Sequence, residues 1–256
     1  MTKLKVAALQ MDIAWEDRAA NYEKAGEMAA RAKADGAGLV VLPEMFATGF
    51  SMNPEVTGEK PGGETHSFLT DLAARLEVAV VGGYVQKRRG GKGANAALAV
   101  APDGSVMSEY FKTHLFRFLD EDEAHEAGAG PRPFGLAGAE AACFVCYDLR
   151  FPELFRLVSK TASLVIVIAS WPAERQRHWD ILLPARAVEN QLYVVGVNRV
   201  GEGGGLSFSG GSVIVDPMGN TIASGGDREG IVMAEIDFGL VAETRAKMPF
   251  LQDRRF

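Results

Sequence analysis

Cysteine is scarce in this chain, with two among 256 residues. Two cysteines cannot form the disulfide framework of a small secreted protein, and this usage fits a reducing compartment. We therefore expect a cytoplasmic protein in which any functional cysteine acts as a free thiol. Long apolar runs are missing too: stretches such as Leu164 to Ala169 fall far short of the roughly 20 residues of a membrane-spanning helix. No association with a membrane is expected.

Positive charge is not in excess either, because 27 lysine and arginine residues stand against 33 acids, for a formal net charge of −6. This balance removes the electrostatic footprint that nucleic-acid binding leaves on a protein. Hydrophobic residues make up 47% of the chain and charged residues 23%, close to globular averages, so disorder and collagen-like repeats are excluded. Glycine, by contrast, is abundant at 29 residues and predicts many tight turns.

Short β-rich runs alternate with stretches of helical period along most of the sequence, which indicates an α/β fold. The patterns predict strands at residues 5–11, 38–42, 78–86, 164–170 and 193–198, and helices at 18–34, 67–76, 152–160 and 175–191. Pro184, inside the last of these helices, predicts a kink or a break there.

Turn residues around Pro102 and Pro217 predict two hairpins, 96–101 with 105–111 and 211–215 with 221–224. Hairpins within an otherwise alternating pattern favour mixed sheets, in a β-sandwich with helices outside, over a TIM barrel. No Ser- or Pro-rich linker divides the chain, so we expect one domain over residues 1–256. The glycine-rich segment 201–211 is expected to form a mobile loop near the functional site.

Cys146 ends an apolar strand, and a predicted helix follows from Pro152. A nucleophile at such a turn meets free backbone N–H groups that can bind an oxyanion and favour a thiolate. The alternative is an inert buried cysteine. Cys143 forms a C-x-x-C with Cys146, but an offset of three on a strand places the two sulfurs on opposite faces, and no second Cys/His cluster completes a zinc site. A Cys–His pair would have four candidate bases: His66, His114, His125 and His178.

Two charged residues also stand at the ends of predicted strands. Glu44 closes GLVVLPE, where it reaches the carboxyl edge of a sheet and suits a general base. Lys112 follows SEYF, and its ammonium can stabilise a developing oxyanion and lower the pKa of a neighbouring thiol. Taken singly, Glu44 is better interpreted as a solvated loop carboxylate and Lys112 as a surface lysine.

Taken together, the segments LPEMF, YFKTHLF and CYDLRFPELFR resemble the nitrilase superfamily, whose members carry a Glu, Lys and Cys triad in this order. PEMFATGFSM, IASWPAERQRHWDILLPARAVENQLYVVGVNRVG and MPFLQDRRF further resemble its ω-amidase branch, which hydrolyses the terminal amide of 2-oxo acid amides such as 2-oxoglutaramate and 2-oxosuccinamate. The resemblance covers essentially the whole chain. It implies a four-layer αββα sandwich, a homodimer, and catalysis that needs neither a metal nor an organic cofactor.

The resemblance also implies roles for individual residues. Cys146 is then the nucleophile, Glu44 the general base and acid, and Lys112 the cation that stabilises the oxyanion. The backbone N–H of Tyr147 is the second oxyanion donor. The family places one more glutamate between the lysine and the cysteine, ahead of an Ala-Gly pair.

Several acids compete for the role of that second glutamate in residues 120–128. Counting back from Gly128 favours Glu121, with Glu123 as the alternative. An acid-rich loop is otherwise a solvated surface. The assignment between the two therefore stays open at this point.

A 2-oxo acid amide carries a carboxylate, so its pocket needs a cation or backbone donors besides the triad. Arg175 is our choice over Arg177 and Arg186, because WPxxR recurs in the ω-amidase branch. An arginine at this place can equally tie loops together through ion pairs. Phe46, Phe50 and Trp171 are candidate apolar walls of the pocket, with a core position as the alternative for each.

Two other functions compete with the ω-amidase reading. The same triad can hydrolyse nitriles or N-carbamoyl amines, and only the branch-level resemblance separates these activities. A non-catalytic interaction protein on the same fold is the second alternative. All three triad positions are occupied, which argues against a protein that has lost its activity.

Overall fold

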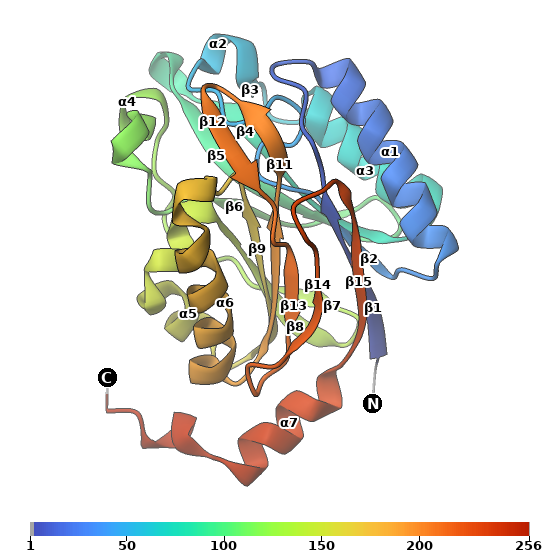
Figure 1. Cartoon of the computed structure of the whole chain (residues 1–256), viewed down its shortest axis with the longest axis vertical. Helices are drawn as coiled ribbons and strands as arrows, with labels where there is room; N and C mark the ends of the chain where they lie inside the picture. The colour runs from blue at the N-terminus through green and yellow to red at the C-terminus, as the bar shows by residue number, and fades with distance from the viewer. Residues whose placement is uncertain (1–2, 256) are drawn as a thin grey trace.

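The computed structural model describes residues 3–255, whose main elements are two mixed β-sheets stacked face to face between helices (Figure 1). The strands of the first sheet are β1 (Lys3–Gln10), β2 (Leu39–Val41), β3 (Gly58–Glu59), β4 (Ala79–Lys87), β5 (Gly93–Val100), β6 (Val106–Phe111) and β15 (Gly230–Asp237). They lie in the order β15-β1-β2-β4-β5-β6, with β3 beside β4. The pairs β1–β2 and β2–β4 are parallel, and β1–β15, β4–β5 and β5–β6 are antiparallel.

The second sheet repeats this arrangement. Its strands are β7 (Phe134–Leu136), β8 (Ala139–Val145), β9 (Ala162–Ala169), β10 (Tyr193–Asn198), β13 (Val213–Val215) and β14 (Thr221–Ser224), in the order β14-β13-β10-β9-β8-β7. β8, β9 and β10 run parallel, whereas the outer strands pair antiparallel. Both hairpins that the turn residues predicted are present, and the mixed character of the sheets is confirmed.

Helices cover the outer face of each sheet. α1 (Arg18–Ala34) and α3 (Glu64–Leu76) lie on the first sheet, and α5 (Pro152–Val158) and α6 (Gln176–Asn190) lie on the second (Figure 1). α2 (Pro54–Thr57) and α4 (Glu121–Ala124) are single turns in loops, and α7 (Phe238–Lys247) leads to the C-terminal end. The four-layer αββα sandwich is therefore confirmed.

The apolar strand β2 shows how the layers are held together. Leu39 and Val41 point into the core between the two sheets, whereas Val40 points into the core under α1 and α3. Successive side chains of a strand face opposite sides, so a strand covered on both faces must be apolar throughout. This explains the continuous run at residues 38–42. It also explains why the chain that follows the strand starts from a fixed, buried position.

Of the kink or break predicted at Pro184, the break does not occur, because α6 runs continuously from Gln176 to Asn190. Trp179, Leu183 and Ala187 on the inner face of this helix are fully buried against the second sheet. Burial of large apolar side chains stabilises by about 1.5–3 kcal/mol each, which is comparable to the cost of a proline inside a helix. Tertiary packing therefore offsets the local penalty.

The prediction of a loop at residues 201–211 is also wrong for most of its length. The segment forms a β-hairpin of its own, β11 (Val200–Gly203) paired with β12 (Leu206–Ser209). Gly204 at its tip lies against the indole of Trp15, and a Cβ there would come within 2.5 Å of that ring. The glycines thus allow a close approach between the hairpin and the loop after β1.

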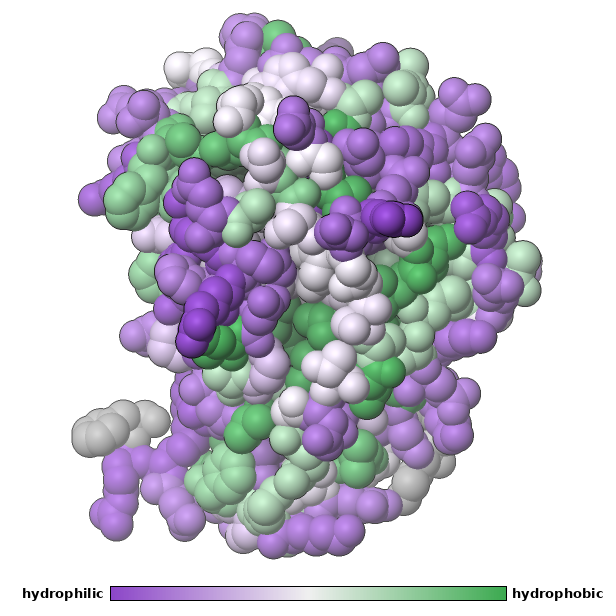
Figure 2. Space-filling view, viewed as in Figure 1, coloured by the Kyte–Doolittle hydropathy of each residue, from purple (hydrophilic) through white to green (hydrophobic). Residues whose placement is uncertain are grey.

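The outer surface is mainly hydrophilic on the face shown in Figure 2, with apolar residues between the charged ones. Within residues 3–255, no helix combines the length and the apolar character that crossing a bilayer requires.

Candidate active site

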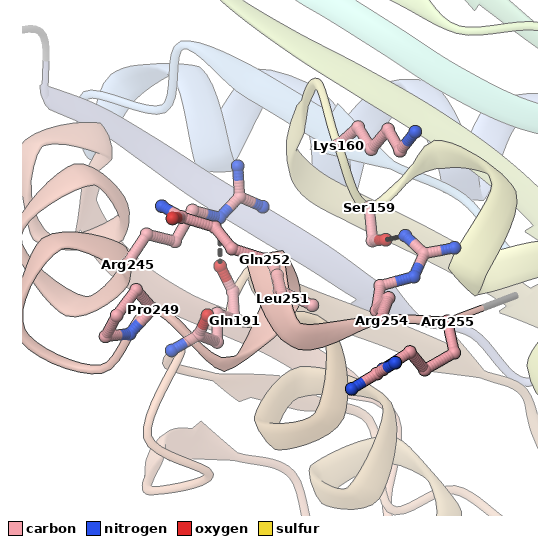
Figure 3. Close-up of a pocket in the computed structure, with 9 residues that line it drawn as sticks. All are labelled: Ser159, Lys160, Gln191, Arg245, Pro249, Leu251, Gln252, Arg254 and Arg255. Carbon is pink, nitrogen blue, oxygen red and sulfur yellow. Dashed lines mark hydrogen bonds between the residues drawn. The ribbon is translucent and has the colours of Figure 1, made fainter.

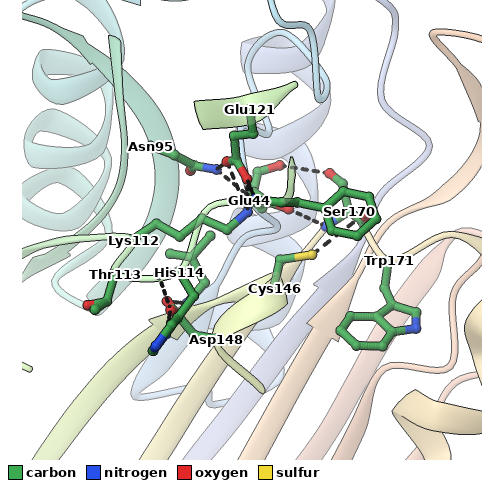
Figure 4. A network of polar contacts seen from close by, with 12 residues as sticks. Glu44, Asn95, Lys112, Thr113, His114, Glu121, Cys146, Asp148, Ser170 and Trp171 are labelled. Atoms are coloured by element: carbon green, nitrogen blue, oxygen red, sulfur yellow. Dashed lines mark hydrogen bonds and ion pairs between the residues drawn. The ribbon is translucent and has the colours of Figure 1, made fainter. Parts of the chain in front are cut away.

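Four side chains that can take part in acid, base or nucleophilic chemistry meet at one edge of the sandwich (Figure 4). Glu44 follows β2, Lys112 follows β6 directly, Cys146 follows β8 directly, and Glu121 begins α4. The exposed fraction is 0% for Glu44, Lys112 and Glu121 and 7% for Cys146. The structure thus brings together four residues that are spread from position 44 to position 146 of the sequence. Three of them are those predicted at strand ends.

A glycine under the backbone of Glu44 makes its position possible. A Cβ at Gly83, on β4, would lie 2.7 Å from the Cα of Glu44 and 2.6 Å from the backbone nitrogen of Met45. Real Cβ atoms do not approach backbone so closely, so a larger residue would displace the carboxylate. Met45 itself has a φ of 47°, in the left-handed region, which turns the chain sharply just after Glu44.

Lys112 lies between two carboxylates. Its Nζ is 3.0 Å from Oε1 of Glu44 and 2.8 Å from Oε2 of Glu121. Burial alone would lower the pKa of Lys112, but the charges of Glu121 and Glu44 outweigh it and hold the pKa above its ordinary value. Burial would raise the pKa of Glu121, yet the attraction of Lys112 prevails and lowers it. Lys112 and Glu121 are therefore both charged at neutral pH.

Cys146 has a φ of 46°, an uncommon value for a residue with a side chain, and starts the 3-10 turn Cys146–Arg150. Its Sγ lies 3.9 Å from the carbonyl oxygen of Ser170. Burial, and then the charge of Glu44, raise the pKa of the thiol well above its usual range. Lys112 lowers it, as expected from the sequence, but by less. The resting cysteine is thus a neutral thiol that needs a base.

Two polar residues complete the hydrogen bonds of Glu44, and the sequence patterns had not singled out either. The backbone N–H of Ser170, directly after β9, donates to Oε2 of Glu44 at 2.7 Å. Nδ2 of Asn95, on β5, donates to Oε1 of Glu44 at 2.7 Å and to Oε1 of Glu121 at 2.9 Å. Ser170 could have been found from its position at a strand end, like Cys146. Asn95 carries no such signal beyond being polar within an apolar strand.

Asp148 ties the cysteine turn to the segment that carries the lysine. Oδ1 of Asp148 accepts from the backbone N–H of His114 at 2.9 Å, and Oδ2 accepts from the hydroxyl of Tyr110 at 2.7 Å. Oδ2 also accepts from the N–H of Val145, 3.1 Å away. Nδ1 of His114 also lies 3.0 Å from Oδ1 of this buried carboxylate. His114 is thus paired with Asp148, whereas the partners of Cys146 are Glu44 and Ser170. The geometry favours a carboxylate as the base of the cysteine.

Cys146 opens into a narrow pocket with a free volume of about 20 Å³. That space holds about one water molecule. Apolar and aromatic side chains form most of the wall, and the two charged residues are both arginines. The lining residues are Phe50, Phe116, Leu119, Cys146, Tyr147, Arg150, Ser170, Trp171, Pro172 and Arg175.

The two arginines are held over aromatic rings. The guanidinium of Arg175 lies 5.2 Å from the ring centre of Phe116, and that of Arg150 lies 4.6 Å from Trp171. Burial, together with the nearby charge of Arg175, lowers the pKa of Arg150 below its ordinary value. Within residues 3–255, the acidic side chain that pairs with Arg175 is the exposed Glu174, at 3.5 Å. The structure therefore places Arg175 in the pocket as predicted and adds Arg150, which the sequence patterns had not singled out.

The other arginines that the sequence suggested lie elsewhere. Arg177 is exposed on α6. Arg186 is buried and donates to the carbonyl oxygen of Leu149 at 2.8 Å, while its Nη1 pairs with Glu189 at 2.9 Å. Arg186 thus stabilises the turn Cys146–Arg150 through its hydrogen bond to Leu149 and does not line the pocket.

The aromatic walls are partly as predicted. Phe50 and Trp171 line the pocket, and the ring of Phe50 lies 5.2 Å from Nζ of Lys112. Phe46 does not line it, so that prediction is wrong. Its ring packs against Tyr22 and Phe68 in the core under α1 and α3. The tight turn after Glu44 directs Phe46 away from the site and leaves Phe50 to reach it.

The glutamate alternatives are separated by burial. Glu121 contacts Lys112 and accepts from the backbone N–H of Phe116 at 2.6 Å, whereas Glu123 is exposed.

The ring of Tyr147, the residue after Cys146, packs against Phe116 with ring centres 5.0 Å apart.

A wider cleft lies between α5 and the C-terminal segment (Figure 3). Its volume is about 600 Å³, and it is lined by Lys160, Arg245, Arg254 and Arg255 among others. No cysteine, aspartate or glutamate is among its lining residues. Within residues 3–255, no group of three His, Cys, Asp or Glu side chains could hold a metal ion.

Comparison with known proteins agrees with this geometry. The sequence profile of the carbon-nitrogen hydrolase family matches residues 5–246. The chain belongs to this family. It is 36% identical to the 2-oxoglutaramate amidase of Bacillus subtilis, over 99% of this chain and 98% of that protein. It is also 34% identical to the omega-amidase YafV of Escherichia coli K12, over 99% and 97% of the two chains.

A solved structure extends the match to three dimensions. The chain superimposes on a CN-hydrolase superfamily protein of Xanthomonas campestris with a TM-score of 0.93 and 33% identity, covering 100% of this chain and 98% of that one. That crystal structure holds an arsenic adduct in its active site. The protein described here is thus a carbon-nitrogen hydrolase of the nitrilase superfamily, an amidohydrolase whose relatives include ω-amidases.

Proposed function

We propose that this hydrolase cleaves the terminal amide of small 2-oxo acid amides, such as 2-oxoglutaramate and 2-oxosuccinamate, to the acid and ammonia. One observation carries the proposal: the nucleophile candidate Cys146 shares a pocket with two arginines and no carboxylate. Such a pocket suits an amide whose far end is negatively charged. The similarity to a 2-oxoglutaramate amidase supports the same class of substrate.

In the proposed first half-reaction, Glu44 takes the proton of the Cys146 thiol and the sulfur attacks the amide carbonyl carbon. The ammonium of Lys112 and the backbone N–H of Tyr147 stabilise the negative oxygen that forms. Glu44 returns the proton to the nitrogen, the C–N bond breaks, and ammonia leaves behind a thioester on Cys146. The raised pKa of the thiol makes the base necessary.

In the second half-reaction, Glu44 removes a proton from a water molecule that attacks the thioester. The C–S bond breaks, the thiolate regains the proton, and the carboxylic acid is released. One carboxylate thus serves both halves, and the proposed route requires neither a metal nor an organic cofactor. Glu121 keeps Lys112 charged and fixed, because it pairs with Nζ at 2.8 Å without facing the pocket.

Arg175 and Arg150 are proposed to bind the carboxylate of the substrate. Arginine presents several N–H donors in a plane, which matches the two oxygens of a carboxylate. Both guanidinium groups lie over aromatic rings at the pocket wall, so they are partly shielded from water, and this strengthens their attraction for an anion. Trp171 supports Arg175 through its Nε1, which donates to the carbonyl oxygen of Arg175 at 2.8 Å.

A panel assay of ammonia release tests the substrate class. The substrates are 2-oxoglutaramate, 2-oxosuccinamate, glutamine, an N-carbamoyl amino acid and a simple nitrile. We expect the two 2-oxo acid amides to have the highest kcat/KM. Preference for the N-carbamoyl amino acid, or activity on the nitrile alone, would instead assign the protein to a sibling activity of the same superfamily.

We also propose a cytoplasmic homodimer. Leu157 on α5 and Ile181 and Val188 on α6 are 69%, 55% and 45% exposed, which offers apolar surface for a second copy. Both cysteines are free thiols, as in a reducing compartment. Sedimentation of the protein as a monomer over a wide range of concentrations would refute the dimer.

A further inference from the structure

We propose that Asn95 is a positioning residue: it fixes the carboxylates of Glu44 and Glu121 and directs the transferred proton to Oε2 of Glu44. The inference rests on the proposed function only for the identity of the substrate. It concerns which oxygen of the general base accepts the proton of the Cys146 thiol.

Asn95 is connected to all three charged residues of the site (Figure 4). Its Nδ2 donates to Oε1 of Glu44 at 2.7 Å and to Oε1 of Glu121 at 2.9 Å. The backbone carbonyl oxygen of Asn95 accepts from the backbone N–H of Lys112 at 2.8 Å. Since an amide nitrogen has two hydrogens, each carboxylate receives one of them. Asn95 is fully buried, so no water competes for these bonds.

The bonds divide the two oxygens of Glu44 into different roles. Oε1 accepts from both Asn95 and Lys112, at 2.7 and 3.0 Å. Oε2 accepts only from the N–H of Ser170, at 2.7 Å, among residues 3–255. The Sγ of Cys146 lies 3.9 Å from the carbonyl oxygen of the same Ser170. Oε2 therefore keeps a lone pair that no donor among residues 3–255 occupies, and the thiol contacts the same residue, Ser170, whose N–H holds Oε2.

The proton then follows one route. The S–H bond of Cys146 breaks as an O–H bond forms at Oε2, and the proton passes from Oε2 to the leaving nitrogen. In the second half-reaction, water gives a proton to Oε2, which returns it to the thiolate. A proton at Oε1 would displace one of the two donors that Oε1 already has, Asn95 or Lys112. Without Asn95, Oε1 has one donor fewer and becomes a competing proton site.

One polar atom of the Asn95 side chain has no hydrogen-bond partner in the described part of the chain. Oδ1 has no hydrogen-bond partner among residues 3–255, although the side chain is 0% exposed. Buried polar atoms without partners are rare because their desolvation is uncompensated. The role of Asn95 rests on the two N–H donors of its amide, since Oδ1 makes no hydrogen bond within residues 3–255.

The test compares Asn95→Ala with Asn190→Ala. Asn190 is a matched control: it is also 0% exposed, its Oδ1 is also unpaired within residues 3–255, and its Nδ2 donates to the carbonyl oxygen of Arg186, away from the pocket. For Asn95→Ala we expect kcat to fall about 100-fold with KM within about threefold, because proton transfer and not binding is impaired. The acid limb of the kcat/KM profile should move to higher pH by about one unit, since an ionised carboxylate loses a donor.

A second readout needs no substrate. The rate at which iodoacetamide alkylates Cys146 reports deprotonation of the thiol, and its acid limb should shift upwards in Asn95→Ala as well. The proposal is overturned if Asn95→Ala, like Asn190→Ala, lowers only the stability and leaves kcat and both acid limbs unchanged. Failure of the protein to hydrolyse 2-oxo acid amides would refute the proposed function but would leave the alkylation result to decide the role of Asn95.

Discussion

The carboxylate of Glu44 and the backbone N–H of Ser170 form a hydrogen bond of 2.7 Å that crosses from one sheet of the sandwich to the other. Glu44 follows a strand of the first sheet, and Ser170 follows a strand of the second. Because the proposed base and nucleophile also come from different sheets, their distance depends on how the sheets pack. The large apolar core between the sheets therefore helps set the geometry of the site.

The two cysteines give opposite predictions although they are three residues apart. Cys146→Ala should lower the turnover of an amide substrate more than about 1,000-fold, because it removes the nucleophile. Cys143 lies in the core between the sheets, 3% exposed. Cys143→Ala should therefore keep the activity and lower the free energy of unfolding by about 1 to 2 kcal/mol. Steady-state kinetics and urea unfolding of both variants check this, and normal activity of Cys146→Ala would contradict it.

Glu121→Gln removes the buried charge that faces Lys112. We expect a fall of about 100-fold in kcat, since Lys112 keeps only Glu44 as an ionised partner, and a loss of stability of about 3 kcal/mol. The exposed Glu123 provides the matched control, and Glu123→Gln should change the stability by less than about 0.5 kcal/mol. Kinetics and denaturant unfolding of both variants are the measurements. Equal effects of the two substitutions would show that Glu121 has no special role.

Arg175→Ala tests the binding of the substrate carboxylate. The kcat/KM for 2-oxoglutaramate should fall about 10- to 100-fold, as expected for the loss of a charge-assisted hydrogen bond, whereas a neutral aliphatic amide of similar length should be unaffected. Arg177→Ala, an exposed arginine two residues away, should change neither value. An equal loss for the charged and the neutral amide would mean that Arg175 only supports the loop.

His125 predicts a dependence of stability on pH. It is 1% exposed, and neither ring nitrogen has a partner among residues 3–255. Burial lowers the pKa of His125 from 6.5 to about 4; the charge of Glu121 opposes the shift, and those of Lys112 and Lys92 add to it. The unfolded chain therefore binds the proton first, and stability falls as the pH drops from about 6.5 to about 4.

From this shift, about 2 kcal/mol of stability should be lost between about pH 7 and about pH 5. His125→Gln has no titrating ring, so its free energy of unfolding should fall less over the same interval. Urea unfolding of both proteins at the two pH values measures the difference. The same pH dependence in the variant and the parent would refute the assignment to His125.

Much of the fold was predictable because its local signals agree with its packing. The helix at residues 18–34 and the strand at 193–198 have the predicted bounds, since helical spacing in the first and a short apolar β-rich run in the second mark the ends clearly. The loop at 201–211 was predicted wrongly, and of the kink or break predicted at Pro184 the break does not occur. In both cases tertiary packing, against the second sheet and against Trp15, decides the conformation.

The site was predictable where residues stand at strand ends. Glu44 and Cys146 follow apolar strands and Lys112 directly follows β6, and strand ends meet at the edges of sheets. Asn95 and Arg150 were not found, because a polar residue within a strand or a turn gives no sign of what it faces. Phe46 was placed in the pocket wrongly, because the direction of a side chain in a tight turn depends on the φ of its neighbours, such as 47° at Met45.

The central claim, that Cys146 forms a thioester during amide hydrolysis, is tested most directly by mass spectrometry of the enzyme quenched with acid during turnover of 2-oxoglutaramate. We predict that the peptide containing Cys146 gains the mass of one 2-oxoglutaryl group, and that Cys146→Ala shows no such adduct. Turnover without any acylated Cys146, or acylation of a different residue, would contradict the account.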